Sequence, residues 1–176
     1  MLDGVMLRTG CVWIGLGLVV GLLTGAPTTG LADGGGGTER VPARPEDPAY
    51  TEAVRAIKTG DFSTAVRLLE TVVAKDGKNA DAYNWLAYSI RRNGDAAGAI
   101  PIYQKALAVD PKHRGAHEYI GEAYLVLGDL ARAKEHLARL DKLCLLPCSE
   151  YSDLKKAVQA YEVSGGQVRP VSKRVP

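Results

Sequence analysis

Aromatic side chains and net charge are both scarce in this chain. Phenylalanine, tryptophan and tyrosine make up 6% of its 176 residues, and the formal net charge at pH 7 is +2. A nucleic-acid-binding protein usually carries a marked basic excess, so this near-balance argues against that class. The apolar content is mostly alanine, leucine and valine, a composition that suits closely packed helices. A chain of this length is enough for one domain.

Patterns that would indicate catalysis or nucleotide binding are missing as well. The three histidines belong to no recognisable Ser-His-Asp or Cys-His arrangement. The glycine run over residues 34–37 is not followed by the Lys-Ser or Lys-Thr pair of a phosphate-binding loop. We therefore expect a protein that is not an enzyme and that uses no cofactor and no metal.

The first 32 residues have the three parts of a secretory signal peptide. Arg8 supplies a positive charge, residues 11–23 form an uncharged apolar run, and Gly30-Leu31-Ala32 offers small residues before a cut at Asp33. We expect cleavage there and a periplasmic location. The alternative is an uncleaved inner-membrane anchor through residues 11–23, a run that is short for a span of about 20 residues.

The segments at the two ends of the remaining chain predict no packed structure. Residues 33–46 contain four consecutive glycines and two prolines, which indicates a flexible leader. Residues 164–176 contain two glycines, two prolines and three cations, and we expect a disordered tail. The folded domain is therefore predicted over residues 47–163.

A 34-residue repeat is the strongest pattern in that domain. A Gly-Asp pair with an alanine four residues later recurs at Gly60-Asp61 and Ala65, at Gly94-Asp95 and Ala99, and at Gly128-Asp129 and Ala133. This period is the length of one helix–turn–helix unit. The glycine accepts a positive φ at the end of the first helix, and the aspartate can cap the second helix. We predict an all-α fold with units over about 46–79, 80–113 and 114–147.

These units resemble the tetratricopeptide repeat family. The resemblance is carried by residues 80–113, which read ADAYNWLAYSIRRNGDAAGAIPIYQKALAVDPKH, and by residues 114–140, which read RGAHEYIGEAYLVLGDLARAKEHLARL. The first unit is similar but has Asp76-Gly77 where Asp-Pro is usual. The resemblance implies a right-handed superhelix of three units and a non-catalytic scaffold that binds another protein.

The resemblance also implies that the first helices of the units line a concave groove. It implies a mixed set of partner-contacting residues, namely Tyr50, Lys58, Asp81, Asn84, Tyr88, Arg91, Arg92, Glu118 and Glu122. Such a groove fits an extended peptide or a helix, with Arg91 or Arg92 pairing with a carboxylate. We expect no nucleic-acid partner and, after cleavage, no membrane partner; self-association is a further possibility.

The third unit ends differently from the others. Residues 143–148 read LCLLPC where Asp-Pro is usual, and Ser149 predicts the N-cap of a capping helix over 149–161. Cys144 and Cys148 are spaced to share one helical face, and two cysteines in an exported chain indicate a structural disulfide. Free thiols, a redox-active pair and metal ligands are the alternatives, and they support an alternative function as a redox- or metal-handling periplasmic protein.

The histidines allow two interpretations. His113 and His117 are four residues apart across the start of a helix, so they form either a possible metal pair or a site where His117 is a partly buried packing residue. His136 lies on the second helix of the third unit, where we expect it to be exposed.

Overall fold

The structure is a computed structural model that describes residues 47–146 and 148–167. In this part of the chain there are seven helices and no strand, which confirms the all-α prediction. The predicted signal peptide over 1–32, the leader over 33–46 and residues 168–176 of the tail lie outside the described residues. None of the helices described is long and apolar enough to cross a bilayer.

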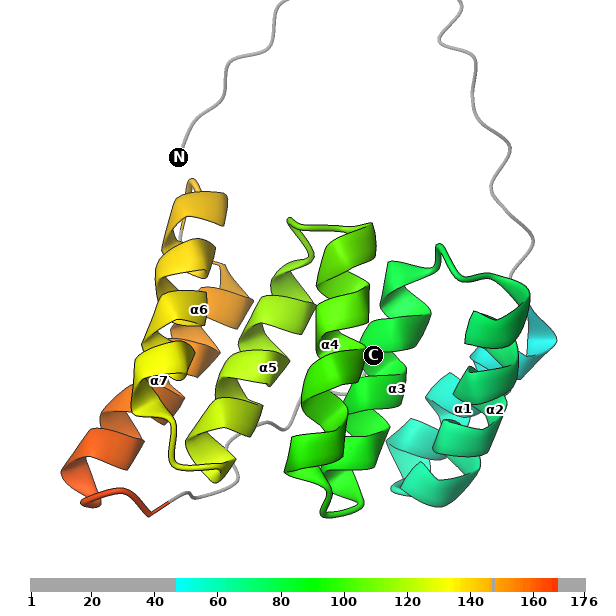
Figure 1. Cartoon of the computed structure of the whole chain (residues 1–176), viewed down its shortest axis with the longest axis horizontal. Coiled ribbons are helices and arrows are strands. Elements are labelled where there is room, and N and C mark those ends of the chain that lie inside the picture. Colours follow the sequence, from blue (N-terminus) through cyan, green and yellow to red (C-terminus); the bar gives the residue numbers. More distant parts are fainter. Residues whose placement is uncertain (1–46, 147, 168–176) are drawn as a thin grey trace, which may run out of the picture. The chain divides into compact units, whose positions relative to one another are not determined.

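The helices stand side by side in chain order, with α1 and α2 at one end and α6 and α7 at the other (Figure 1). They are α1 (Pro48–Thr59), α2 (Phe62–Lys75), α3 (Ala80–Arg92), α4 (Ala96–Val109), α5 (Arg114–Val126), α6 (Leu130–Leu143) and α7 (Ser149–Val163). The pairs α1–α2, α3–α4 and α5–α6 each fall within one predicted unit. The fold is a helical-repeat superhelix of three helix pairs and a capping helix.

The turn inside each pair has the geometry that the Gly-Asp repeat predicts. The φ angles are 81° at Gly60, 100° at Gly94 and 81° at Gly128. These left-handed values favour glycine, which has no Cβ. The aspartate that follows caps the next helix by accepting a hydrogen bond from the backbone N–H three residues later, at 3.0, 2.7 and 3.0 Å for Asp61, Asp95 and Asp129.

The first helices of the pairs and α7 form one layer, which we call the inner layer. In this layer α1 contacts α3, α3 contacts α5 and α5 contacts α7. The outer helices α2, α4 and α6 contact inner-layer helices but, within the described residues, not one another. Helices in equivalent positions of successive units therefore contact one another only in the inner layer.

Helix α5 is buried over most of its length. Every residue from Ala116 to Leu125 is buried, and α3, α4, α6 and α7 all pack against the helix. Gly121 allows a close approach of α7, because a Cβ at this position would lie 2.6 Å from Cδ2 of Leu154 on α7. Leu154 itself is fully buried. The capping helix therefore docks on a glycine of the third unit.

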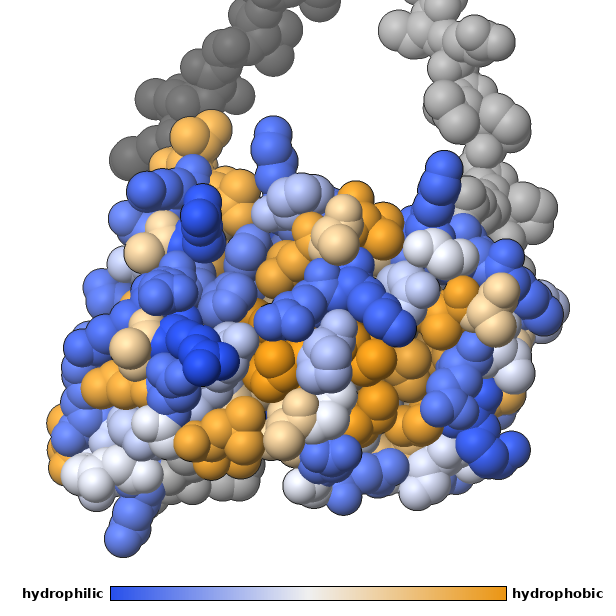
Figure 2. Space-filling model, in the orientation of Figure 1, coloured by the Kyte–Doolittle hydropathy of each residue, from blue (hydrophilic) through white to orange (hydrophobic). Residues whose placement is uncertain are grey.

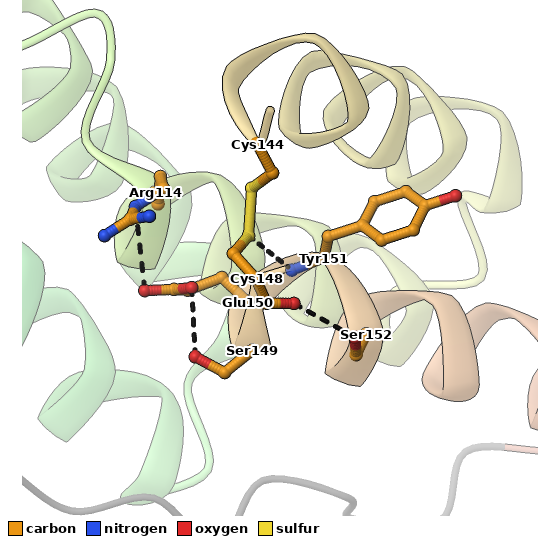
Figure 3. Close-up of a disulfide and its surroundings, with 7 residues drawn as sticks. All are labelled: Arg114, Cys144, Cys148, Ser149, Glu150, Tyr151 and Ser152. Atoms are coloured by element: carbon orange, nitrogen blue, oxygen red, sulfur yellow. Dashed lines mark hydrogen bonds and ion pairs between the residues drawn. A yellow bond between two sulfur atoms is a disulfide. The ribbon is translucent and has the colours of Figure 1, made fainter. Parts of the chain in front are cut away.

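The loop before α7 differs in two ways from the prediction. Cys148, and not Ser149, is the N-cap of α7, since its Sγ accepts a hydrogen bond from the backbone N–H of Tyr151 at 3.4 Å (Figure 3). Cys144 has an extended backbone, with φ −99° and ψ 97°, so α6 ends before it. The two cysteines flank the loop and do not share one helical face. The structure joins them by a disulfide with Cα atoms 5.7 Å apart.

Residues 164–167, where the predicted tail begins, form a hydrogen-bonded turn at the end of α7. The hydroxyl of Ser164 accepts a hydrogen bond from the backbone N–H of Gln167 at 3.1 Å and donates one to the carbonyl of Gln167 at 2.6 Å. The capping helix itself extends to Val163, two residues beyond the predicted end.

Candidate protein-binding surface

All the residues that the resemblance assigns to the groove lie on α1, α3 or α5, which belong to the inner layer. Their exposure differs widely. Lys58, Asp81 and Arg92 are exposed, Tyr50 and Arg91 are half-buried, and Asn84, Tyr88, Glu118 and Glu122 are buried. The contact of these residues with a partner stays a prediction. Of the set, a partner can directly reach the exposed side chains of Lys58, Asp81 and Arg92.

Arg91 is engaged in an internal ion pair. Its Nη2 lies 2.9 Å from Oε2 of Glu122, and the two side chains are only 10% and 6% exposed. The guanidinium also lies 5.5 Å from the ring centre of Tyr88 and 5.9 Å from that of Tyr119, which are distances of cation–π contact. Arg91 therefore links α3 to α5. Because its guanidinium is already paired with Glu122, Arg91 is a poor candidate for binding a carboxylate of a partner.

Arg92, the next residue, is seated on aromatic side chains at the surface. Its guanidinium lies 4.6 Å from the ring centre of Phe62, and its Nη1 donates a hydrogen bond to the hydroxyl of Tyr88 at 2.5 Å. Aromatic contacts hold the planar guanidinium in place while Arg92 stays exposed. A positioned, accessible guanidinium is suited to bidentate binding of a carboxylate.

The third unit and the capping helix make the other end of the inner layer acidic. Glu118 and Glu122 are one turn apart on α5 and are 2% and 5% exposed. Burial raises the pKa of the Glu122 carboxyl, and the negative charge of Asp153 on α7 acts in the same direction, while Arg91 acts against them. Burial and the charge of Glu118 likewise raise the pKa of the intervening Tyr119. Asp153 could not be predicted from the sequence, because the repeat pattern assigns no groove position to the capping helix.

The three histidines have separate roles in the structure. His113 is the N-cap of α5, with Nδ1 accepting a hydrogen bond from the backbone N–H of Ala116 at 3.0 Å and Nε2 lying 3.0 Å from Oδ1 of Asp81. His117 lies with its Nδ1 2.9 Å from Nδ1 of His136. Among the described residues, no three histidine, cysteine, aspartate or glutamate side chains form a group that could hold a metal ion.

The expectation that His136 is exposed is wrong. The side chain is half-buried and stacks on Tyr124 with ring centres 5.8 Å apart. Nε2 of His117 lies 3.1 Å from the carbonyl oxygen of Pro111 and so carries the proton that it donates there. In the neutral pair, Nδ1 of His117 accepts the hydrogen bond and Nδ1 of His136 donates it. This pair links α5 to α6.

Acidification is expected to weaken the fold through His136. Burial, followed by the nearby His117 and Arg139, lowers the pKa of His136 to about 4 from an ordinary value of 6.5. Above pH 6.5 the ring is neutral in both the folded and the unfolded chain. Between pH 6.5 and 4 the unfolded chain binds a proton that the folded chain excludes, so the unfolding free energy falls as the pH falls.

Urea denaturation at several pH values across this window measures the effect. The variant His136→Gln keeps a hydrogen-bonding side chain but cannot titrate, so its stability should depend less on pH between 6.5 and 4. An equally steep dependence in the variant would contradict the assignment to His136.

The outer layer carries fewer charges at its centre. In Figure 1, α2 and α6 lie in front of α1 and α7, and Figure 2, in the same orientation, shows apolar side chains gathered over and beside α4. The sequence of α4, AAGAIPIYQKALAV, includes a single charged residue, Lys105. Lys105 is exposed and offers a position for control substitutions away from the inner layer.

Comparison with known proteins agrees with this architecture. Two tetratricopeptide repeat family models match residues 50–108 and 91–144. A cellulose synthase 2 operon protein C from Komagataeibacter xylinus is 30% identical over 113 residues, which are 64% of this chain and 8% of that protein. The chain spans a tenth or less of the length of the curated relatives that it matches.

Solved structures of similar fold include a type III secretion translocator chaperone from Yersinia enterocolitica, SycD. It is 18% identical, with a TM-score of 0.61 over 68% of this chain and 84% of that one. The same chaperone in complex with a peptide of the translocator YopD gives a TM-score of 0.58 at 20% identity, over 66% and 88% of the two chains. Together the repeat spacing, the helix pairs and the family matches show that the chain belongs to the tetratricopeptide repeat family.

Proposed function

We propose that this protein is a non-catalytic binding module whose inner layer holds a peptide segment of another protein. The family and the fold support a protein-interaction scaffold, and a chaperone of similar fold has been seen in complex with a peptide. The observation that carries the proposal is the exposed guanidinium of Arg92, which aromatic side chains hold in position on the inner layer.

The distribution of charge along the inner layer indicates the order of charges in the partner segment. Lys58 on α1 and Arg92 on α3 are exposed cations, whereas Glu118, Glu122 and Asp153 make the α5 and α7 end acidic. A segment that lies across the layer would place acidic side chains over the first two units, where Arg92 binds a carboxylate. Opposite charges along the two partners would steer the encounter and set its direction.

Affinity capture from a cell-envelope extract tests this proposal. The full chain is compared with Lys58→Glu/Arg92→Glu on the inner layer and with Lys105→Glu on the outer layer. We expect a partner that binds the full chain and the outer-layer variant but not the inner-layer variant. Arg91 is kept in all of them, because changing it would disrupt the buried ion pair. Equal capture by all three proteins, or capture by none, would contradict binding at the inner layer.

We further propose that the protein is exported to the periplasm. The three-part pattern of residues 1–32 supports this, and a disulfide between Cys144 and Cys148 fits an oxidising compartment. Because the disulfide connects the end of α6 to the start of α7, it favours a structural role over the redox alternative. Mass spectrometry of the purified protein should find Asp33 as the first residue, and an intact residue 1 in the membrane fraction would support the anchored alternative instead.

A further inference from the structure

Glu118 and Glu122 occupy a side of α5 that no described helix covers. Helices α3 and α7 flank α5 within the inner layer, and α4 and α6 pack on its outer side. The inner side is therefore left open by the helices, yet Glu118 and Glu122 are only 2% and 5% exposed. Arg91 of α3 accounts for part of the burial of Glu122, since its Nη2 lies 2.9 Å from Oε2 of Glu122. The burial of Glu118 on this side is what a segment of chain lying over α5 would produce.

The end of α7 brings the chain close to the end of α5 at the α5–α6 turn. Gly165 and Gly166 have φ angles of 68° and 99°, and the backbone N–H of Gly166 donates to the carbonyl of Tyr161 at 3.0 Å. This left-handed ending turns the chain away from the helix axis. The hydroxyl of Tyr161 lies 3.8 Å from the position of a Cβ on Gly128, so the turn lies beside the end of the α5–α6 pair.

The residues that follow this turn have the chemistry that an acidic surface would bind. Residues 168–176 read VRPVSKRVP and contain three cations and no acidic side chain. The two prolines disfavour a helix and favour an extended backbone. An extended segment of this length spans about 30 Å, whereas α5, with 13 residues, is about 20 Å long. The segment is long enough to run along α5 from end to end.

The other segment outside the helices is a poorer match. Residues 33–46 contain both acidic and basic side chains, in nearly equal numbers. They precede α1, which lies at the opposite end of the row of helices from α7 (Figure 1). Charge and proximity therefore both select residues 168–176.

We propose that residues 168–176 bind within the same chain to the inner side of α5 and α7, with their cations against Glu118, Glu122 and Asp153. This inference rests on the proposed function, because it takes the inner layer to be a peptide-binding surface and names residues 168–176 as a segment that binds there. A tethered segment has an effective concentration of about millimolar. It therefore competes with any partner segment for the acidic end, and a partner must displace it.

A peptide-binding measurement tests this inference. The probe is a fluorescein-labelled synthetic peptide of residues 168–176, and its binding is followed by fluorescence anisotropy. Three proteins are compared: the full chain, a chain that stops at Gln167, and a full-length chain with Arg169→Glu/Lys173→Glu/Arg174→Glu. We expect the last two to bind the peptide at least tenfold more tightly than the full chain does. The charge-reversed chain keeps the test valid if the shortened chain fails to fold.

Two controls locate the contact. In the charge-reversed chain, Glu118→Gln should weaken binding of the probe, whereas Glu70→Gln, an equal loss of charge at an exposed position of the outer helix α2, should leave it unchanged. A probe with glutamate in place of its three cations should not bind. Equal affinity of all three proteins for the probe, or no binding to any of them, would overturn the inference.

The outcomes separate this inference from the proposed function. Partner capture that depends on Arg92, without any binding of the probe, would leave the proposed function standing and reject the inference. Binding of the probe to the charge-reversed chain, without a captured partner, would support the contact within the chain and count against the proposed function.

Discussion

Arg91→Met is expected to lower the unfolding free energy by about 3–5 kcal/mol, the usual cost of leaving one member of a buried ion pair without its partner. Both members are nearly buried, and their charged atoms lie 2.9 Å apart. Methionine replaces the aliphatic stem of arginine with an apolar chain, so the main effect is the loss of the charged guanidinium beside Glu122. Urea denaturation at pH 7, with circular dichroism of the helices as the signal, measures the change.

The matched control is Arg92→Met. Arg92 is exposed, and surface substitutions usually change stability by about 0.5 kcal/mol or less. The double variant Arg91→Met/Glu122→Leu should recover most of the loss, because an apolar pair can replace a buried ion pair at little cost. A loss below about 1 kcal/mol in Arg91→Met would show that water reaches Glu122, since solvated pairs contribute about that much.

The effect of Arg91→Met should also depend on pH. Burial already raises the pKa of Glu122, with Arg91 acting against it, so removing Arg91 raises that pKa further. A raised pKa means that the folded chain holds a proton that the unfolded chain has released, so the protonated form contributes stability that is lost as the pH rises. The stability difference between Arg91→Met and the unchanged protein should therefore shrink as the pH is lowered from 7 to 5.

Leu154→Ala should cost about 3–5 kcal/mol, the range for a fully buried leucine whose cavity cannot collapse. Leu154 is fully buried and its side chain lies directly over Gly121, so truncation opens a cavity between α5 and α7. The capping helix should separate first, because α7 is the last helix of the row. Hydrogen exchange should therefore show faster exchange in α7 than in α3 relative to the unchanged protein.

Gly121→Ala provides the matched test of this contact. Its Cβ would lie 2.6 Å from Cδ2 and 2.8 Å from Cδ1 of Leu154, and overpacking of this kind costs about 1–3 kcal/mol. In the double variant Gly121→Ala/Leu154→Ala, the new methyl group enters the space that Leu154 leaves. The combined loss should be smaller than the sum of the two single losses. Additive losses would show that the two residues do not share one packing site.

Local features of the fold could be predicted because each depends on a few neighbouring residues. A glycine with positive φ and an aspartate that accepts a nearby backbone N–H form the same turn wherever Gly-Asp recurs, as at Gly60-Asp61. Apolar residues at helical spacing then pair the helices of each unit. For the same reason the helix pairs stay within the predicted units.

The candidate site could be predicted only in part. The repeat spacing assigns residues to the inner helices, but it does not distinguish Arg91 from Arg92, which are adjacent and chemically identical. Only the packing of α3 against α5 decides that Arg91 is buried with Glu122, while Arg92 stays exposed on Phe62. Likewise, the capping role of Cys148 depends on where α6 ends.

The sequence by itself determined the all-α repeat and its turns, because local backbone preferences and helical spacing act within one 34-residue unit. Tertiary structure alone decided which polar groups are buried together. The contact between His117 and His136, and the one between Arg91 and Glu122, join residues on different helices. Such contacts depend on how successive helices pack, and no local pattern encodes which side chains that packing brings together.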